Sequence, residues 1–298
     1  MTRRGSRSWT ANGPRSARRS RLGFGRTIST RPAASAGPSP TSARGGCDAD
    51  GVRICTWNIQ LGSRLDRVVG AVRSQPDFAS VDLMALQEAS VHDGRPDAEA
   101  IAEALGPGYR SFQATAQIRR EKSQANALIW RHGLFQSGRS PEVVPLPGPG
   151  DVEVRPVERT LLRAAPPQAR MALCVESDTL RVYVLHLDVI GFTHKLEQFK
   201  TVVSHMAGRE PVSMEIVAGD LNTFGPARVQ VWRRLAAAAR SAGLVNVTAG
   251  IRSTHWTGQK LDAIYARTAA PVSHRAWTLK VRASDHLPVF AEINPRAH

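Results

Sequence analysis

The stretch V-A-G-D-L-N-T, residues 217–223, decides the fold of this chain. A short apolar run ends abruptly at Asp220, and Asn222 follows with one residue between. Side chains two apart on a strand project to the same side, so both could face one ligand at the edge of a sheet. The plainer alternative is an Asx turn that only ends the strand, and the motif alone does not decide between the two.

Three other apolar runs carry polar side chains of the same kind at their ends. They are T-W-N-I-Q (56–60), A-L-Q-E (85–88) and S-D-H-L-P-V (284–289). Carboxylate, amide and imidazole groups gathered at strand ends are what a hard metal ion and a phosphate ester require. Four such clusters in one chain suggest a hydrolase.

Each polar residue in these clusters also has a structural interpretation. Glu88 suits magnesium, which prefers one or two carboxylates plus water, but a lone strand-end acid is more often simply exposed. Asn58 would add an amide oxygen, although by itself such a residue usually belongs to a turn. His286, next to Asp285, can accept or donate a proton near neutral pH, with a solvent-bonded loop histidine as the alternative.

Two further residues stand in apolar surroundings. Asp262 lies within K-L-D-A-I-Y, where an unpaired carboxylate would be costly. Its natural partner is an imidazole, and His286 is the candidate, while a bond to a backbone amide is the alternative. His186 ends the run V-Y-V-L-H, a position that is more often structural than catalytic.

Other histidines, lysines and motifs give weaker evidence about function. His255 and His274 lack ligand-like spacing, and Lys195, Lys200 and Lys260 are interpreted as solvated side chains. The chain has no G-x-S-x-G, no G-x-x-x-x-G-K and no H-E-x-x-H, which excludes the usual serine hydrolase, P-loop and zincin patterns.

Charge divides the 298 residues into two parts. Residues 1–51 hold ten Arg and two Asp, a net +8 of the total +15, in a background of Ser, Pro, Gly and Ala. Such a segment buries too little apolar surface to offset chain entropy, so we predict a disordered basic extension at 1–51 and one folded domain at 52–298. The opening T-R-R lacks the apolar core of a signal peptide, which leaves a mitochondrial-type presequence or a true start near Val52.

The cysteines and the hydropathy bear on location. Cys47, Cys55 and Cys174 are an odd number without metal-site spacing, and the last two are predicted to be buried thiols. A reducing, cytoplasmic location follows as the expectation. No run approaches the ~18 apolar residues that span a membrane, so we expect no transmembrane segment, and we expect a monomer.

Periodicity predicts more strands than helices from residue 52 onward. Helices are expected at 61–73, 97–105, 193–206 and 226–242. Strands are expected at 52–57, 82–87, 125–130, 171–175, 180–187, 214–218, 261–266, 276–281 and 288–293. The Pro- and Gly-laden segment 132–168 is expected to form a hairpin with surface loops. This pattern predicts two packed sheets with helices outside, an α+β fold.

Seven short motifs follow one another along the chain. They are T-W-N-I (56–59), L-Q-E (86–88), A-N-A-L-I (125–129), H-L-D (186–188), G-D-L-N (219–222), L-D-A-I-Y (261–265) and S-D-H-L-P-V (284–289). In this order they resemble the endonuclease/exonuclease/phosphatase superfamily, which includes deoxyribonucleases, apurinic endonucleases, sphingomyelinases and inositol polyphosphate phosphatases. The resemblance covers nearly all of residues 52–293 and implies a deoxyribonuclease-like, four-layer α/β/β/α sandwich.

The resemblance also implies a metal site. Glu88 would be the principal ligand of Mg²⁺, with Asn58 beside it and Asp285 near the ion. Mn²⁺ is the alternative ion.

Roles in catalysis follow from the same resemblance. Asp220 would orient or deprotonate the attacking water, and Asn222 would help to position the water and the phosphate. His286, oriented by Asp262, would contact the scissile phosphate or act as the base. His186 would bind phosphate oxygens or assist the leaving group.

Two functions therefore compete. The leading one is a magnesium-dependent phosphoester hydrolase, in which an activated water attacks a phosphodiester or phosphomonoester in line. The +7 left for residues 52–298 suits any polyanion, so nucleic acid, a phospholipid head group and a sugar phosphate are the candidate substrates. The alternative is a nucleic-acid-binding or scaffold protein on a catalytically silent copy of the same fold.

Overall fold

A computed structural model describes residues 26–27, 51–119, 121–135, 139–164, 168–225, 228–269 and 271–295. The extension predicted at 1–51 lies outside the described residues except for Gly51 and the pair 26–27. The division of the chain at residues 51 and 52 stays a prediction.

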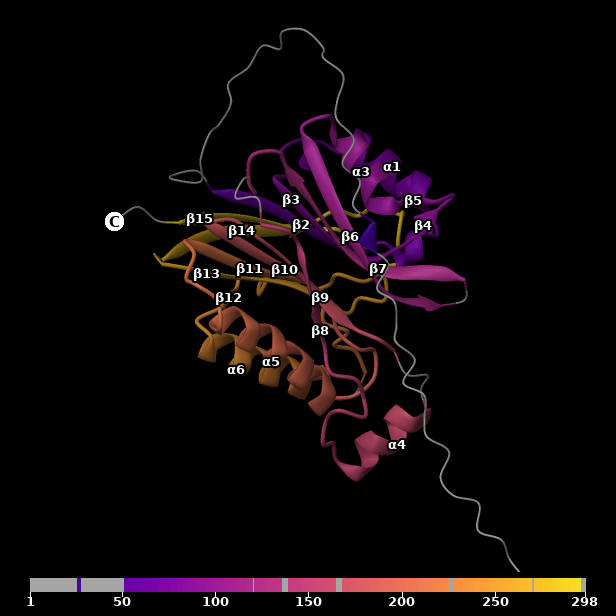
Figure 1. Cartoon of the computed structure of the whole chain (residues 1–298), viewed down its shortest axis with the longest axis vertical. Coiled ribbons are helices and arrows are strands. Elements are labelled where there is room, and N and C mark those ends of the chain that lie inside the picture. The colour runs from indigo at the N-terminus through magenta and orange to yellow at the C-terminus, as the bar shows by residue number, and fades with distance from the viewer. Residues whose placement is uncertain are drawn as a thin grey trace, which may run out of the picture.

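Two β-sheets lie face to face at the centre of the molecule (Figure 1). The strands of the first sheet are β1 (Arg26–Thr27), β2 (Val52–Asn58), β3 (Leu83–Ala89), β6 (Tyr109–Arg119), β7 (Lys122–Arg131), β14 (Val272–Thr278) and β15 (Val289–Pro295). Those of the second are β8 (Glu142–Pro145), β9 (Met171–Glu176), β10 (Leu180–His186), β11 (Met214–Asp220), β12 (Val245–Asn246) and β13 (Asp262–Thr268). A separate two-stranded sheet pairs β4 (Val91–His92) with β5 (Arg95–Pro96).

The two sheets share a pairing pattern at their centres. The spatial order is β1-β6-β7-β3-β2-β15-β14 in the first and β12-β13-β11-β10-β9-β8 in the second. Strands β2 and β3 are parallel, as are β10 and β11, and each pair has antiparallel neighbours on both sides. Because both parallel pairs end in polar residues, each sheet presents a polar edge at the carboxyl ends of its central strands.

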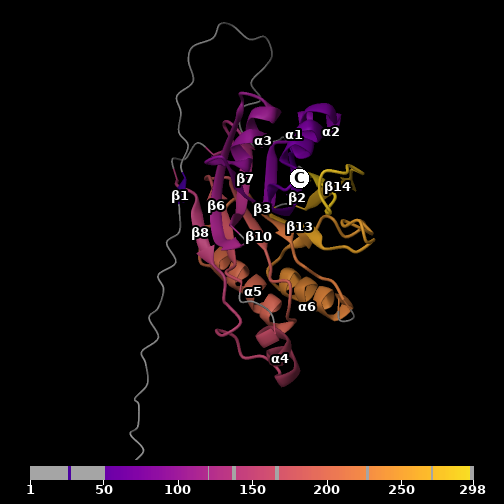
Figure 2. The same ribbon diagram turned by 90° about the vertical axis from the view of Figure 1, so that its right-hand side faces the viewer.

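Helices cover the outer face of each sheet (Figures 1 and 2). The first sheet is covered by α1 (Leu65–Ser74), α2 (Pro76–Ala79) and α3 (Asp97–Leu105), and the second by α5 (Thr193–Ala207) and α6 (Arg228–Ser241). A 3-10 turn, η1 (Gln60–Gly62), follows β2. Helix α4 (Pro156–Ala164) lies below α5 in the view of Figure 1.

Alternating side chains explain how the layers hold together. On β10, Val182 and Val184 face the core between the sheets, while Tyr183 and Leu185 pack against α5 and α6. A strand buried on both faces needs a continuous apolar run, which the sequence of β10 supplies. Three apolar clusters, one between the sheets and one under each helix layer, confirm the predicted α+β class and the four-layer sandwich.

Most predicted elements are found, with a few corrections. The helix expected at 61–73 is divided into η1 and α1, the strand expected at 276–281 is shifted to β14, and the described part of the last helix begins at Arg228. The segment 132–168 contains the helix α4 as well as β8, and β6 was not predicted. β6 was not recognised in the sequence because only two of its apolar side chains, Phe112 and Ala114, are deeply buried, so the alternation of apolar and polar residues along it is weak.

Gly219 yields a test of this packing. Its φ is +154°, and a Cβ built on it would lie 1.8 Å from the carbonyl oxygen of Leu185 on the paired strand β10. We expect Gly219→Ala to lower the free energy of unfolding by about 3 kcal/mol or more, because backbone atoms rather than a flexible side chain obstruct the methyl group. Urea denaturation measures the change, and Gly108→Ala, where nothing lies within 4 Å, should stay close to the parent.

Candidate active site

Three predicted site residues are direct neighbours across adjacent strands. His186 at the end of β10 is paired with Asp220 at the end of β11, and Asp220 is paired with Asp262 at the start of β13. All three are buried, and Asp262 is completely so. Strand register therefore brings two carboxylates and an imidazole together with no contribution from flexible loops.

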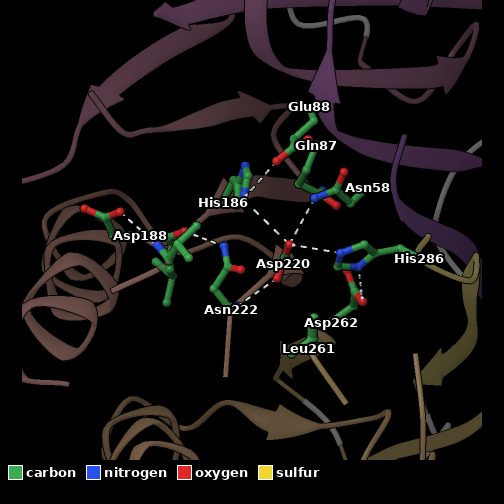
Figure 3. Close-up of polar contacts among 12 residues, drawn as sticks. Asn58, Gln87, Glu88, His186, Asp188, Asp220, Asn222, Leu261, Asp262 and His286 are labelled. Atoms are coloured by element: carbon green, nitrogen blue, oxygen red, sulfur yellow. Dashed lines mark hydrogen bonds and ion pairs between the residues drawn. The ribbon is translucent and has the colours of Figure 1, made fainter. Parts of the chain in front are cut away.

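Asp220 is at the centre of the site (Figure 3). Its Oδ2 accepts a hydrogen bond from Asn58 Nδ2 at 3.0 Å, and its Oδ1 accepts one from the backbone N–H of Asn222 at 2.8 Å. The Nε2 atoms of His186 and His286 lie 3.6 and 3.7 Å from Oδ2. Burial raises the pKa of Asp220 to about 6, with nearby Asp262 adding to the rise and His286 opposing it.

His286 is held by a buried carboxylate. Its Nδ1 lies 2.9 Å from Asp262 Oδ2, and its backbone oxygen accepts a bond from Trp57 Nε1 at 2.9 Å. Burial alone would lower the pKa of the imidazole, but the charges of Asp262 and Asp220 outweigh it and raise the pKa to about 10. His286 is therefore an imidazolium at neutral pH, and the sequence-predicted pairing with Asp262 is present in the structure.

His186 is neutral and has a defined tautomer. Arg170 Nη1 lies 3.0 Å from His186 Nδ1, and a guanidinium can only donate, so Nδ1 accepts and the proton sits on Nε2. Burial, followed by the charges of Arg170 and His286, lowers the pKa of His186 well below its usual value. The Nε2–H of His186 thus faces Asp220 and also Glu88, whose Oε1 is 3.9 Å away.

Glu88 reaches the site through an irregularity in β3. The register of β3 against β7 shifts between Leu86 and Ala89, and Glu88 has a φ of +52°. Such a bulge re-aims one side chain out of the strand's alternation. Gln124 Nε2 donates to Glu88 Oε1 at 3.2 Å, and burial raises the pKa of Glu88, with Asp285 adding to the rise while Arg170 and His286 oppose it.

The remaining predicted residues lie around this centre. Asn58 turns its Nδ2 toward Asp220, and its Oδ1 accepts the N–H of Gln60 at 3.0 Å. Asn222 has a φ of +49° and donates its Nδ2 to the backbone oxygen of Leu187 at 2.8 Å. Asp285 is about one-third exposed and accepts a bond from Ser284 Oγ at 3.1 Å.

A hard divalent cation fits the chemistry of this donor set. The charge of Asp285 adds to the raised pKa of Glu88, and the Asn58 side chain is hydrogen-bonded to Glu88. Two carboxylates and an amide are oxygen ligands that Mg²⁺ prefers. Such an ion would relieve the repulsion between the two carboxylates.

Two buried partners of the site were not predicted. Lys195, interpreted from sequence as solvated, is buried and donates its Nζ to the backbone oxygen of Asn222 at 2.6 Å. Its helical spacing from Gln198, Phe199 and Val202 was the available signal, because those residues form the buried face of α5. Arg170 precedes β9 and has no comparable signal.

The comparisons with known proteins identify the family of the chain. The sequence pattern of the Endonuclease/Exonuclease/phosphatase family matches residues 55–286, and the chain belongs to that family. Members of this family are generally hydrolases of phosphoester bonds and are typically dependent on a divalent metal. None of the curated proteins matched the sequence.

Solved structures with the same fold share little sequence. An endonuclease/exonuclease/phosphatase from Beutenbergia cavernae superposes with a TM-score of 0.63 at 19% identity, covering 83% of this chain and 72% of its own. The human nocturnin catalytic domain with bound sulfate gives 0.58 at 16%, covering 83% and 94%. An AP endonuclease from Leishmania major gives 0.56 at 14%, covering 83% and 89%. Identities this low show the fold alone.

The sequence predicts no transmembrane segment. Within the residues that the structure describes, no helix is both long enough and apolar enough to cross a membrane.

The raised pKa of His286 predicts that its contribution to the free energy of unfolding depends on pH. A pKa of about 10 in the folded state against an ordinary 6.5 means that the charged imidazole stabilises the fold fully below pH 6.5, and that this contribution is lost as the pH rises to about 10. The loss of unfolding free energy in His286→Asn should therefore be largest near pH 6.5 and shrink toward pH 10. Urea denaturation in chelator over this range measures it, with exposed His274→Asn as the control; a pH-independent difference would contradict the ion pair.

Arg170 makes a separate, spectroscopic prediction. In Arg170→Met the donor to His186 Nδ1 is gone, so we expect His186 to populate the Nδ1–H tautomer in part. Long-range ¹H–¹⁵N spectra of the ring distinguish the two tautomers. Arg163→Met removes an exposed arginine and should leave the His186 signals unchanged; an unaltered tautomer in Arg170→Met would remove the assigned role.

Proposed function

We propose that this protein is a Mg²⁺-dependent phosphoester hydrolase, with Mn²⁺ as the alternative ion. One observation carries the proposal: the buried Asp220 carboxylate has an imidazole on each side, with Nε2 atoms 3.6 and 3.7 Å from its Oδ2. An acceptor of protons flanked by two proton donors suits attack by water on a phosphorus centre that carries negative oxygens.

The pKa values support a division of roles. Asp220, with a pKa of about 6, is largely ionised at neutral pH and can accept a proton from the attacking water. His286, with a pKa of about 10, already carries its proton and suits donation to a phosphate oxygen rather than base catalysis. His186 is neutral with its proton on Nε2, which suits a second donor to the phosphate or the leaving group.

The asparagines and Asp262 suit positioning. Asp262 fixes the ring of His286 through Nδ1, and Asn222 holds Asp220 through its backbone N–H. Because the Nδ2 of Asn222 is engaged by Leu187, its amide oxygen is the atom left to orient water. Glu88, Asn58 and Asp285 are the proposed ligands of the magnesium ion, which when bound would neutralise charge on the phosphate.

Substrate is proposed at the level of class. The overall charge of +15 favours a polyanion, either a phosphodiester or a phosphomonoester, in nucleic acid, a phospholipid head group or a sugar phosphate. The sulfate in the nocturnin domain supports an oxyanion site in this fold, since sulfate and phosphate share a tetrahedral shape. The alternative, a silent nucleic-acid-binding or scaffold protein, has less support because every proposed catalytic group is present. A monomer and a cytoplasmic location stay predictions.

Replacing the central carboxylate tests the mechanism. Asp220→Ala is expected to reduce metal-dependent turnover by roughly 10²- to 10⁴-fold, because the proton acceptor is lost. The purified protein is assayed with and without chelator against plasmid DNA, RNA, sphingomyelin, a generic phosphodiester and a phosphomonoester. His286→Ala should behave similarly, and Asp66→Ala, an exposed carboxylate on α1, should match the parent.

Circular dichroism of each variant establishes that the fold survives. Full activity in both Asp220→Ala and His286→Ala would refute the assigned roles. Steep loss of substrate binding with salt would favour nucleic acid among the candidates.

A further inference from the structure

Three side chains next to the proposed catalytic centre form a second ligand cluster. His255, Asp285 and His286 each offer one donor atom, and these atoms lie within 4.8 Å of one another. His255 Nε2 is 3.8 Å from Asp285 Oδ2, and the rings of His255 and His286 are 4.9 Å apart at their centroids. His255 was set aside on sequence grounds because its spacing to other histidines is irregular.

Backbone hydrogen bonds hold the two segments of this cluster together. The N–H of Trp256 donates to the oxygen of Asp285 at 3.0 Å, and the N–H of Leu287 donates to the oxygen of Thr254 at 2.8 Å. His255 and His286 form an isolated antiparallel bridge. The ligand atoms are therefore close because the backbone places them so, and not through a chance contact of long side chains.

Groups outside the cluster orient all three donors. The Nδ1 of His286 is bonded to Asp262 at 2.9 Å, and the Nδ1 of His255 lies 2.7 Å from Thr257 Oγ1 and accepts the backbone N–H of Thr257 at 3.3 Å. Asp285 Oδ1 accepts from Ser284 Oγ, which leaves Oδ2 toward His255. Metal-binding histidines usually donate the N–H of their second ring nitrogen to a carboxylate or carbonyl, as His286 does to Asp262, whereas the Nε2 of His255 must give up its proton to bind an ion.

The donor types select the ion. Two imidazole nitrogens and one carboxylate suit a first-row transition metal such as Zn²⁺, whereas Mg²⁺ prefers oxygen ligands and water. Three protein ligands leave a coordination position open for water. Zinc lies about 2.0–2.1 Å from such donors, so the ligand atoms must approach one another by about 1 Å. The side chains of His255 and Asp285, which are 15% and 32% exposed, have room to do so.

We propose that His255, Asp285 and His286 bind a first-row transition-metal ion, which would replace the proton on His286 Nε2 and so exclude donation of that proton to a phosphate while the ion is bound. The site differs from the oxygen ligands at Glu88 in its two nitrogen donors. It shares Asp285 with them, and the ion would lie beside Asp220, whose Oδ2 is 3.7 Å from His286 Nε2. The inference does not depend on hydrolytic activity, because ion binding is measured without turnover.

Calorimetry with the metal alone tests the site. The full chain is freed of metal by chelator and dialysis, then titrated with Zn²⁺ and, separately, with Mg²⁺. We expect one equivalent of Zn²⁺ whose affinity falls at least tenfold in His255→Asn. The matched control His274→Asn, on an exposed face of β14, should bind as the parent does.

Glu88→Gln separates the two proposed ion sites. It should retain the equivalent of Zn²⁺ that His255→Asn loses. Equal Zn²⁺ binding by the parent and His255→Asn would overturn the proposal, as would equal loss in Glu88→Gln or in His274→Asn.

Spectra of the unmodified chain guard against misfolded variants. On addition of one equivalent of Zn²⁺, the ring signals of His255 and His286 should shift while that of His274 stays in place. If the rings of His255 and His286 do not respond, the site is wrong whatever the variants do.

Discussion

The cost of burying Asp220 and Asp262 governs how this site is built. Two carboxylates on adjacent paired strands repel each other and are shielded from water, so the fold must supply opposing charge. The His286 imidazolium supplies it, lying between Asp262 at 2.9 Å and Asp220 at 3.7 Å, and the buried Arg170 contributes from the other side through His186. The hydrogen bonding of the buried carboxylates is nevertheless incomplete, because Oδ1 of Asp262 has no hydrogen-bond partner among the described residues. Such an arrangement of buried carboxylates lowers the stability of the fold and is more consistent with a catalytic role than with a structural one.

The rigid sheets hold the two carboxylates in place despite the free-energy cost of burying them. His186, Asp220 and Asp262 are consecutive across three hydrogen-bonded strands, so their positions follow from backbone register. Glu88 and Asn222 depart from regular geometry, with φ of +52° and +49° at strand ends. Left-handed backbone at non-glycine residues is unfavourable, and it persists here because the flanking strands over-determine it. These two residues are the ones we propose to face the metal ion and the phosphate, and the alternation of a strand alone would not aim their side chains there.

Sequence patterns could predict the elements that bury large side chains. Residues 52–57 and 180–187 are recognisable strands because β-branched and aromatic side chains fill both faces, and 97–105 is a recognisable helix because its apolar residues follow a period of 3.6. Helix α4 was not recognised because it is set among Pro and Gly, with exposed Val157 and Leu161 that carry little core signal. Among site residues, Arg170, Lys195 and His255 escaped because their roles depend on partners far along the chain.

By itself the chain determined which chemistry was available: apolar runs that must be strands, each ending in Asn58, Glu88, His186 or Asp220, in an order that identifies the family. Helices and strands could be predicted because they depend on the periodicity of apolar and polar residues, which is present within each short stretch. Only the tertiary structure decided the protonation of each group, since a pKa depends on burial and on charges contributed by distant segments. It alone also decided that His255 meets Asp285 and His286, because that contact depends on backbone pairing between two loops that nothing in their local sequence specifies.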